Sequence, residues 1–388
     1  MKKKRKIWIF AGESSGDMYG ARLGEELRRI AASRGEEVEL SGMGGKAMTA
    51  AGIPVKVDSS ELGVMGVVEV AKLLFKFIAI YIKMVKAARQ ERPDTVVLID
   101  YPGFNLLYAL AMYFSKIKVV WYIAPHLWMW GKWRLPVLAK ICTKVLVIFP
   151  FEVEVFSKTP LQATFTGHPL IDMMAQKKDP SIIRDPDLVL LLPGSRAGEI
   201  SRMLCHILGS VAELKRRRPQ LRFRLPAPRE KIARQCEDII REFRKKTPDL
   251  PEIEISIGDT NYCQQLAGTG IAACGTVTVE CAIMGLPLVV GYNLSPVNYL
   301  VAWLHGVKPF RGFITMTNII DNTPVCPEFI QGKFKESNIV PAVESILPGG
   351  PRRESTLAGM ERVTQMLSEG NNGRSAIARA AEEIYSSC

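Results

Sequence analysis

The sequence predicts an α/β protein built from two parallel-sheet domains of similar size. Short runs of β-branched and apolar residues alternate with helical patterns, which is typical of parallel strands joined by crossover helices. These runs form two sets, and the segment 170–187 between them mixes charged residues with proline. We therefore expect a domain boundary near 170–187 and a site of activity in a cleft between the two domains.

The predicted strands follow one another in a regular order. The first set lies at 7–11, 38–43, 96–100, 118–124, 144–150 and 163–167, and the second at 188–194, 222–227, 252–257, 270–275 and 287–292. The tail from about 340 to 388 indicates two helices separated by PGGPRRE. Ligands of open parallel sheets bind outside the carboxyl ends of the strands, so the residues that follow each run are the first candidates for chemistry.

Composition narrows the class of protein and its partners. The chain has 388 residues with 47% hydrophobic residues, which excludes disordered, collagenous and coiled-coil proteins. A formal net charge of +12 predicts an anionic partner, but charge alone does not choose among nucleic acid, a membrane surface and a phosphorylated ligand. The eight cysteines show no spacing that suits zinc, so we expect reduced thiols and no metal site.

The loop after the first strand contains Gly12-Glu13-Ser14-Ser15-Gly16. Small residues between a strand and a helix allow a ligand to approach the backbone closely, and free amides there favour an anion or a sugar. The same letters match the G-x-S-x-G nucleophile elbow, so a hydrolase using Ser14 is an alternative. That alternative is weak because a hydrolase elbow normally follows several earlier strands.

Two other loops carry weaker signals. The glycines at 41–45 fit neither a dinucleotide fingerprint nor a P-loop. Asp185-Pro186-Asp187 has the form of a metal-binding D-x-D, but it precedes a strand, so we interpret it as linker.

Asp100 closes the third predicted strand, in IDYPGFN at 99–105. A carboxylate at the end of a buried strand is costly unless it is paired or used in function. Asp100 is therefore a candidate general base, and a turn-capping aspartate is the alternative.

Four of the six tryptophans lie in WYIAPHLWMWGKWR at 121–134, together with His126, Lys132 and Arg134. Such aromatic residues stack on sugars, lie at a lipid interface or simply fill a core, and the basic residues suit a phosphate. His126 is a second-rank candidate, since a single histidine is more often structural than catalytic.

The second domain has two candidate phosphate loops. Pro193-Gly194-Ser195-Arg196 follows the strand at 188–194, and arginine makes charge-assisted bonds to phosphate. Gly275-Thr276 leads into a helix that carries Glu280, which could accept both ribose hydroxyls of a nucleotide. Together these loops predict a nucleotide site.

The segment 63–89 is apolar over much of its circumference and carries only Lys and Arg from residue 72 onward. It is interrupted by charges, so no uncharged run reaches the ~18 residues that a membrane-spanning helix needs. The segment predicts either a helix in a membrane interface or an amphipathic helix packed on the sheet.

An ordered series of motifs resembles the lipid-A-disaccharide synthase family over nearly the whole chain. They are AGESSGD at 11–17, GMGG at 42–45, MGVVEV at 65–70, IDYPGFN at 99–105, FPFE at 149–152, TGHPL at 166–170, LLPGSR at 191–196, GTVTVE at 275–280, and TNII with PEFIQ at 317–331.

The resemblance implies a GT-B glycosyltransferase with two Rossmann-like domains facing a cleft. It implies an acceptor and membrane-associating domain at 1–175, a UDP-donor domain at 186–345, and helices at 346–388 that cross back to the first domain. Such enzymes transfer 2,3-diacylglucosamine from its UDP derivative to the 6-hydroxyl of 2,3-diacylglucosamine 1-phosphate, giving a β-1,6 disaccharide and UDP. They need no metal or cofactor, bind no nucleic acid, and are peripheral on the inner face of the Gram-negative inner membrane.

The resemblance also assigns roles to residues. Asp100 and Glu13 are the implied catalytic residues, while Ser14, Asn105 and His126 line the acceptor side. The implied UDP-donor residues are Arg196, Gly275, Thr276, Glu280, Asn318, Glu328 and Gln331. The implied membrane-associating residues are Leu73, Leu74, Phe75, Phe77, Ile78, Ile80 and Tyr81.

The chain departs from the family pattern at His126, at Cys274 and at Met316-Thr317. The family usually has glutamine or serine, serine, and Leu-Pro at these places, so the departures bear on acceptor fit and acyl-chain preference. Rival interpretations are a GT-B enzyme acting on soluble UDP-sugars, such as an epimerase, and a basic adaptor without enzymatic activity.

Overall fold

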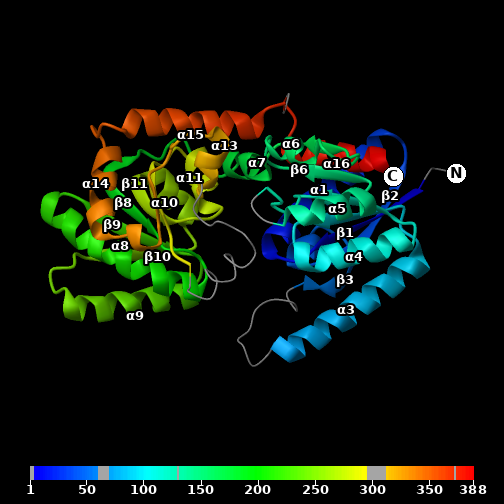
Figure 1. Cartoon of the computed structure of the whole chain (residues 1–388), viewed down its shortest axis with the longest axis horizontal. Coiled ribbons are helices and arrows are strands. Elements are labelled where there is room, and N and C mark those ends of the chain that lie inside the picture. Colours follow the sequence, from blue (N-terminus) through cyan, green and yellow to red (C-terminus); the bar gives the residue numbers. More distant parts are fainter. Residues whose placement is uncertain (1–3, 60–69, 129–130, 295–311, 371–372) are drawn as a thin grey trace. The chain divides into compact units, whose positions relative to one another are not determined.

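The computed structural model describes residues 4–59, 70–128, 131–294, 312–370 and 373–388. The chain separates into two compact units, which Figure 1 shows in sequence colours. Unit 1 comprises residues 1–172 and 367–388, and unit 2 comprises 173–366. Sequence analysis had placed the first boundary within 170–187. The expected segment 346–388 is divided, since its last helix belongs to unit 1.

Unit 1 contains a seven-stranded sheet in the order β3-β2-β1-β4-β5-β6-β7, with every neighbouring pair parallel. The strands are β1 (Lys4–Ala11), β2 (Glu37–Gly44), β3 (Val55–Asp58), β4 (Thr95–Ile99), β5 (Lys118–Tyr122), β6 (Lys144–Val147) and β7 (Ala163–Phe165). The short edge strand β3 was not predicted, so Asp100 follows the fourth strand and not the third.

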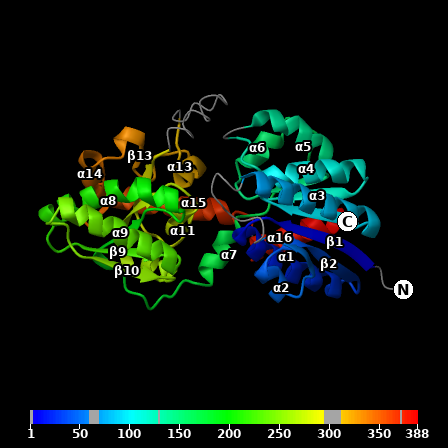
Figure 2. The same cartoon turned by 90° about the horizontal axis from the view of Figure 1, so that it is seen from below.

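Helices cover both faces of this sheet, as Figure 2 shows. They are α1 (Ser14–Ser33), α2 (Lys46–Ala50), α3 (Val70–Glu91), α4 (Pro102–Phe114), α5 (Leu135–Ile141), α6 (Glu152–Phe156), α7 (Pro169–Ala175) and α16 (Ala376–Ser387). Buried residues of α3, α4 and α5 form one core with Trp8, Phe10 and Trp121. On the other face α1 packs against α16, so the last helix of the chain completes this layer (Figure 2).

Unit 2 contains a six-stranded sheet in the order β10-β9-β8-β11-β12-β13, again parallel throughout. The strands are β8 (Asp185–Leu192), β9 (Arg222–Ala227), β10 (Ile253–Ile257), β11 (Ala267–Ala273), β12 (Leu288–Tyr292) and β13 (Glu328–Ile330). Asp185 and Asp187 begin β8 instead of forming a linker, and Asp185 pairs with Arg222 on the neighbouring strand.

The helices of unit 2 are α8 (Ala197–Arg217), α9 (Glu230–Lys246), α10 (Thr260–Leu266), α11 (Val277–Ile283), α13 (Met316–Asp321), α14 (Glu336–Ile346) and α15 (Arg353–Ser368). Residues of α8, α9 and α14 share one core with strands β8 to β12. Both units are therefore open parallel α/β sheets, and the predicted fold class is confirmed.

Candidate active site

Four neighbouring strands of unit 1 end in titratable groups. Glu13 follows β1, Asp100 follows β4, His126 comes shortly after β5, and Glu152 comes shortly after β6. Because β1, β4, β5 and β6 are consecutive in a parallel sheet, these groups gather at its carboxyl edge. Sequence analysis predicted three of them and did not assign a role to Glu152.

The backbone around Asp100 adopts an unusual conformation. Asp100 and Tyr101 both have positive φ, at 46° and 48°, a left-handed conformation that is uncommon for residues other than glycine. The loop is held by a bond from the Asp100 amide to the Tyr122 carbonyl at 3.1 Å. The Asn105 amide donates to the carbonyls of Asp100 at 2.6 Å and Ile99 at 3.3 Å. Strain of this kind persists only where the surroundings enforce it, and it clusters at functional sites.

Asn105 is fully buried, so it does not line a surface as the resemblance implied. Its side chain instead supports the Asp100 loop through the hydrogen bond to the Asp100 carbonyl.

The charge state of Asp100 depends on its neighbours. Burial raises the pKa of Asp100, and the negative charges of Glu13 and Glu152 raise it further. The positive charge of His126 and a hydrogen bond from the Tyr101 amide oppose this rise. A carboxyl whose pKa is moved by burial and named charges is typical of an acid–base group.

Tyr101 is a residue of the site that sequence analysis missed. Its ring lies where a Cβ of residue 12 would be, 2.4 Å from that position, so the first loop needs glycine there. Burial and the charge of Glu13 raise the pKa of its phenol. The ring thus joins the loops after β1 and β4.

Glu13 and Ser14 are exposed at the start of α1. Among the described residues no hydrogen bond joins Ser14 to a histidine or another base, so the geometry gives a nucleophilic serine no activating partner.

His126 lies beside the buried carboxylate of Glu152, with 3.5 Å between Nδ1 and Oε1. Glu152 also accepts hydrogen bonds from the Trp128 indole at 3.2 Å and the Phe149 amide at 3.3 Å. A signal for Glu152 was present in FPFE at 149–152, which follows a predicted strand as IDYPGFN does.

In unit 2, the loops after β8 and β11 present open backbone and an arginine. Arg196 precedes α8, is exposed, and makes no side-chain hydrogen bond or ion pair within the described residues. Gly275 has open space on its Cβ side, with no atom within 4 Å. Thr276 precedes α11, and half-buried Glu280 lies one turn into that helix. An anion can approach both loops without displacing a packed side chain, except that Glu199 Oε2 lies 3.4 Å from the Ser195 amide.

Glu280 accepts a hydrogen bond from the Gln264 side chain at 3.3 Å, and three further predicted donor residues are engaged in internal hydrogen bonds. Asn318 is fully buried and pairs with the backbone of Cys326 through both ends of its amide. Glu328 accepts from the amides of Ile314 and Thr315 and from Asn318 at 2.9–3.1 Å. Gln331 bonds the backbone of Leu294. These three residues shape the loops around β13, and Asn318 is not exposed to a ligand.

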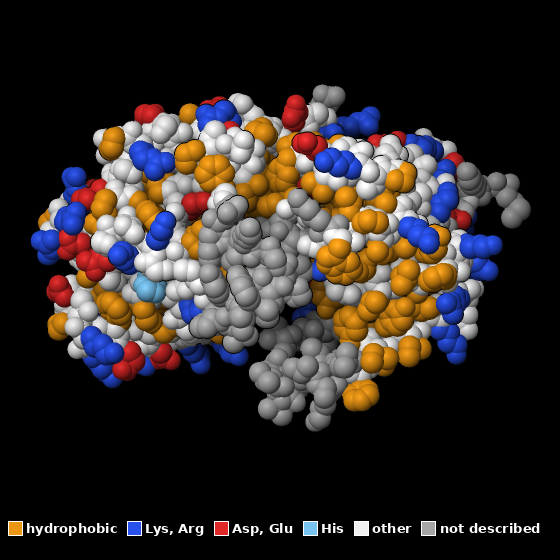
Figure 3. Space-filling view, in the orientation of Figure 1, with side chains coloured by type: hydrophobic (Ala, Val, Ile, Leu, Met, Phe, Trp, Pro, Cys, Tyr) orange, Lys and Arg blue, Asp and Glu red, His pale blue; other side chains and the backbone are white. Residues whose placement is uncertain are grey.

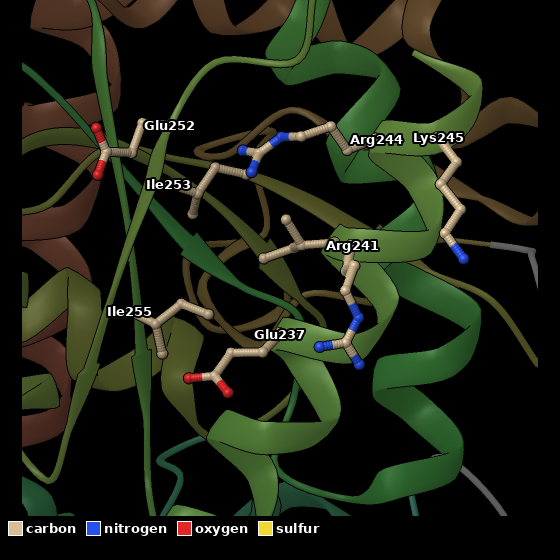
Figure 4. Close-up of a pocket in the computed structure, with 8 residues that line it drawn as sticks. Glu237, Arg241, Arg244, Lys245, Glu252, Ile253 and Ile255 are labelled. Atoms are coloured by element: carbon tan, nitrogen blue, oxygen red, sulfur yellow. The ribbon is translucent and has the colours of Figure 1, made fainter. Parts of the chain in front are cut away.

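A separate pocket of about 550 Å³ opens between α9 and the edge strand β10 (Figure 4). Its charged residues are largely engaged, since Arg241 pairs with Asp238, Lys245 pairs with Glu242, and Arg244 donates to the Pro251 carbonyl. None of the predicted site residues lines it.

The predicted membrane-associating residues separate into two groups. Phe75 and Ile78 are exposed, Phe75 at 75%. Ile80 is buried in the core of unit 1, so its side chain does not lie on a membrane surface, while Phe77 and Tyr81 are half-buried and pack edge-on against Phe104. The backbone of Leu73 and Leu74 lies in α3, but their side chains, like residues 60–69, lie outside the described part.

Additional apolar side chains are exposed on α3 and on α4, which packs beside it. We define the α3–α4 patch as Phe75, Ile78, Ile82, Leu107, Leu110 and Phe114. Figure 3 shows hydrophobic side chains gathered over these two helices. Exposed apolar side chains that gather on one face are typical of an interaction site. No helix in the described part of the chain is long and apolar enough to cross a bilayer.

The family model and the related proteins that match this chain all indicate the same family. A family model described as lipid-A-disaccharide synthetase matches residues 7–382. The lipid-A-disaccharide synthase of Koribacter versatilis is 32% identical over 98% of both chains, and that of Geobacter metallireducens is 33% identical over 94% of both. The Coxiella burnetii enzyme of the same name is 32% identical over 95% of both chains.

Solved structures show the same architecture at low identity. A putative UDP-N-acetylglucosamine 2-epimerase from Listeria monocytogenes is 14% identical with a TM-score of 0.58, covering 98% of this chain and 95% of that one. A calicheamicin glycosyltransferase is 13% identical with a TM-score of 0.56, covering 100% and 98%. At such identity the likeness shows the GT-B fold alone, and the epimerases give no support to the epimerase alternative.

Proposed function

The chain belongs to the lipid-A-disaccharide synthase family and is a glycosyltransferase, and on this premise we propose that it joins two diacylated glucosamines. The proposed donor is UDP-2,3-diacylglucosamine. The proposed acceptor is 2,3-diacylglucosamine 1-phosphate, whose 6-hydroxyl attacks the anomeric carbon of the donor. The products are the β-1,6-linked disaccharide 1-phosphate and UDP.

The observation that carries the proposed mechanism is the environment of Asp100. Its carboxylate takes the proton of the acceptor hydroxyl while the oxygen forms the new bond to the anomeric carbon. The bond from that carbon to the diphosphate breaks, and UDP leaves with the electron pair. Burial and neighbouring carboxylates raise the pKa of Asp100, which makes it a stronger base than an exposed aspartate. Glu13, on the adjacent strand end, contributes to that environment.

We propose that unit 2 binds the UDP portion of the donor. Arg196 and the backbone amides at Gly275-Thr276 hold the diphosphate, and Glu280 binds the ribose hydroxyls. Asn318, Glu328 and Gln331 support the loops around β13 through their own hydrogen bonds. Arginine and fixed amides stabilise the charge of departing UDP, so we propose that the reaction needs no metal ion or other cofactor.

Both substrates carry acyl chains, and we propose that the α3–α4 patch binds the membrane that holds them. The apolar residues of the patch enter the lipid interface, and neighbouring basic side chains such as Lys86 and Arg89 attract anionic headgroups. The protein would then be peripheral on the inner face of the inner membrane, with no role for nucleic acid.

The decisive experiment measures UDP release in detergent micelles with both acylated substrates. We expect release that depends on the acceptor and is unchanged by a chelator. Release without acceptor would indicate a hydrolase or an epimerase instead, and an absence of release would refute the proposed substrates.

Membrane binding is tested by co-sedimentation with vesicles that contain anionic phospholipid. Phe75→Ser combined with Phe114→Ser should weaken binding, since the two side chains are 75% and 72% exposed. Ile183→Ser is the matched control, because Ile183 is an exposed apolar residue of unit 2 outside the patch. Equal binding of the patch variant and the control would contradict the proposal.

A further inference from the structure

Glu152 is a carboxylate buried in unit 1. Its side chain is only 2% exposed, and its described contacts are the Trp128 indole, the Phe149 amide and His126. The first two partners are neutral, and taking a carboxylate out of water without a cation is costly. The geometry therefore favours a positive charge on His126.

His126 presents its two ring nitrogens to different surroundings. Nδ1 lies 3.5 Å from Glu152 Oε1, and the ring packs against Trp128 and Phe149 at centroid distances of 5.7 and 5.9 Å. The side chain is still 44% exposed, and no hydrogen bond to Nε2 is found among the described residues. The ring is thus fixed on one side and accessible on the other.

Two titratable groups, Glu152 and Asp100, act on the pKa of His126. Burial alone lowers the pKa of His126, but the hydrogen bond and charge of Glu152 and the charge of Asp100 outweigh it, so the pKa is raised above its ordinary value. His168 stays neutral, because burial and the nearby charge of His126 lower its pKa to about 3. The charged form of His126 therefore persists to higher pH than that of an ordinary exposed histidine.

The proposed acceptor brings a charge of about −1.5 to −2 to this sheet edge through its phosphate. Glu13, Asp100 and Glu152 are all carboxylates, so the phosphate needs a cation to offset their repulsion. His126 follows the strand next to that of Asp100, and its charge acts on Asp100. An acceptor whose hydroxyl is at Asp100 therefore has a cation available for the other end of the same sugar.

We propose that the imidazolium of His126, held in its charged form by Glu152, binds the anomeric phosphate of the acceptor. This subsite rests on the proposed function, because it assumes a sugar 1-phosphate as acceptor. Glu152 is a positioning residue that acts through His126. The pair selects phosphorylated acceptors over neutral ones.

The test compares two acceptors, 2,3-diacylglucosamine 1-phosphate and its 1-O-methyl glycoside, by the rate of UDP release in micelles. His126→Asn should raise KM for the phosphorylated acceptor roughly 10- to 100-fold, the effect of losing one charge-assisted bond. The rise in KM for the methyl glycoside should be at least tenfold smaller. His126 is exposed on one side, so this variant is expected to keep the fold, and circular dichroism checks it.

The role of Glu152 is tested by the pH dependence of KM for the phosphorylated acceptor. In the unmodified protein KM should rise as pH passes upward through the raised pKa of His126. In Glu152→Gln this rise should begin at lower pH, because the negative charge of Glu152 no longer raises the pKa of His126. Glu154→Gln is the matched control, since Glu154 is an exposed carboxylate of the same helix and should leave the profile unchanged.

A conservative replacement separates charge from packing. His126→Lys should keep the preference for the phosphorylated acceptor, remove the rise in KM with pH up to about pH 9, and be insensitive to Glu152→Gln. Equal effects of His126→Asn on both acceptors, or an unshifted profile in Glu152→Gln, would overturn the subsite. Failure of the unmodified protein to release UDP with either acceptor would instead refute the proposed function.

Discussion

The strand ends of unit 1 and those of unit 2 present different chemical groups. In unit 1, four neighbouring strands present titratable side chains. Glu13, His126 and Glu152 act on the pKa of Asp100, and Glu152 and Asp100 raise the pKa of His126. In unit 2, the equivalent edge presents open backbone at Gly275 and Arg196, which has no side-chain partner among the residues that the structure describes, while the carboxylate of Glu328 is occupied by backbone amides.

The difference matches the chemical demands of the two proposed substrates. An acceptor hydroxyl must lose a proton, which requires a side chain with an adjusted pKa and neighbours that maintain it. A leaving diphosphate needs fixed positive charge and amide donors, which do not titrate near neutral pH. We therefore expect substitutions and pH changes at the sheet edge of unit 1 to act through the charge of each residue. At the edge of unit 2, we expect activity to depend on the open space at Gly275 and on the charge of Arg196.

The largest expected effect is the acid sensitivity of unit 1. His168 is buried and accepts the Leu170 amide at Nδ1, and burial lowers its pKa to about 3. The unfolded chain takes up a proton near pH 6.5, so stability present above that pH is lost as pH falls, by roughly 1.4 kcal/mol per unit and in total about 4 to 5 kcal/mol by pH 3.

Chemical denaturation between pH 7 and 4, followed by tryptophan fluorescence, measures this loss, because five of the six tryptophans belong to the unit 1 sequence. His206→Gln is the control, since His206 is exposed in unit 2. If unit 1 were no more acid-sensitive than unit 2, the proposed distinction would be wrong.

The next largest effect is expected for Asp100→Asn. Loss of the base should lower kcat roughly 10²- to 10⁴-fold and leave the affinity for UDP unchanged. Asp94→Asn changes an exposed aspartate at the opposite end of β4 and should have normal activity. Retention of more than a tenth of kcat in Asp100→Asn would make Asp100 an orienting group instead of the base.

Arg196→Ala tests the fixed charge of unit 2. Loss of the arginine that contacts the diphosphate should weaken UDP binding about 10- to 100-fold, measured by calorimetry. The melting temperature should not fall, because Arg196 makes no side-chain bond within the described residues. Arg229→Ala removes an exposed arginine that precedes α9 in the same way. Similar losses in both variants would indicate a diffuse basic surface and no specific contact.

The smallest effect is expected for Gly275→Ala, which tests space. A Cβ meets nothing within 4 Å in the free protein, so the fold should be unaffected. UDP binding should weaken by about tenfold or less, near 1.4 kcal/mol, because the methyl group occupies the approach to the backbone amides. Gly209→Ala, inside α8, should leave UDP affinity unchanged, and unchanged affinity in Gly275→Ala as well would move the diphosphate elsewhere.

The fold was predictable where strands are buried on both faces. Runs such as 96–100 stand out because each residue of β4 is buried. The edge strands β3 and β13 have only four and three residues and lack a continuous apolar run, so no sequence pattern predicts them. Their position depends on pairing with β2 and β12, which is a tertiary property.

The site was predictable where position along a strand is sufficient. Asp100 and Arg196 follow strands directly, and the parallel sheet determines the rest. Glu152 and Tyr101 were missed because their contributions depend on contacts with His126 and Gly12. Helical periodicity on α3 did not distinguish the face that packs on Phe104 from the exposed face, so Ile80 was assigned to the wrong one.

The packing of α16 on α1 determines the order in which the protein can mature during translation. Unit 2 ends at residue 366. All of its residues are therefore synthesised before α16 of unit 1, which begins at residue 376. Residues 4–33 emerge first and remain without this partner for on the order of tens of seconds, at roughly 5–20 residues per second. The face of α1 that α16 covers therefore stays without this partner until α16 has been synthesised.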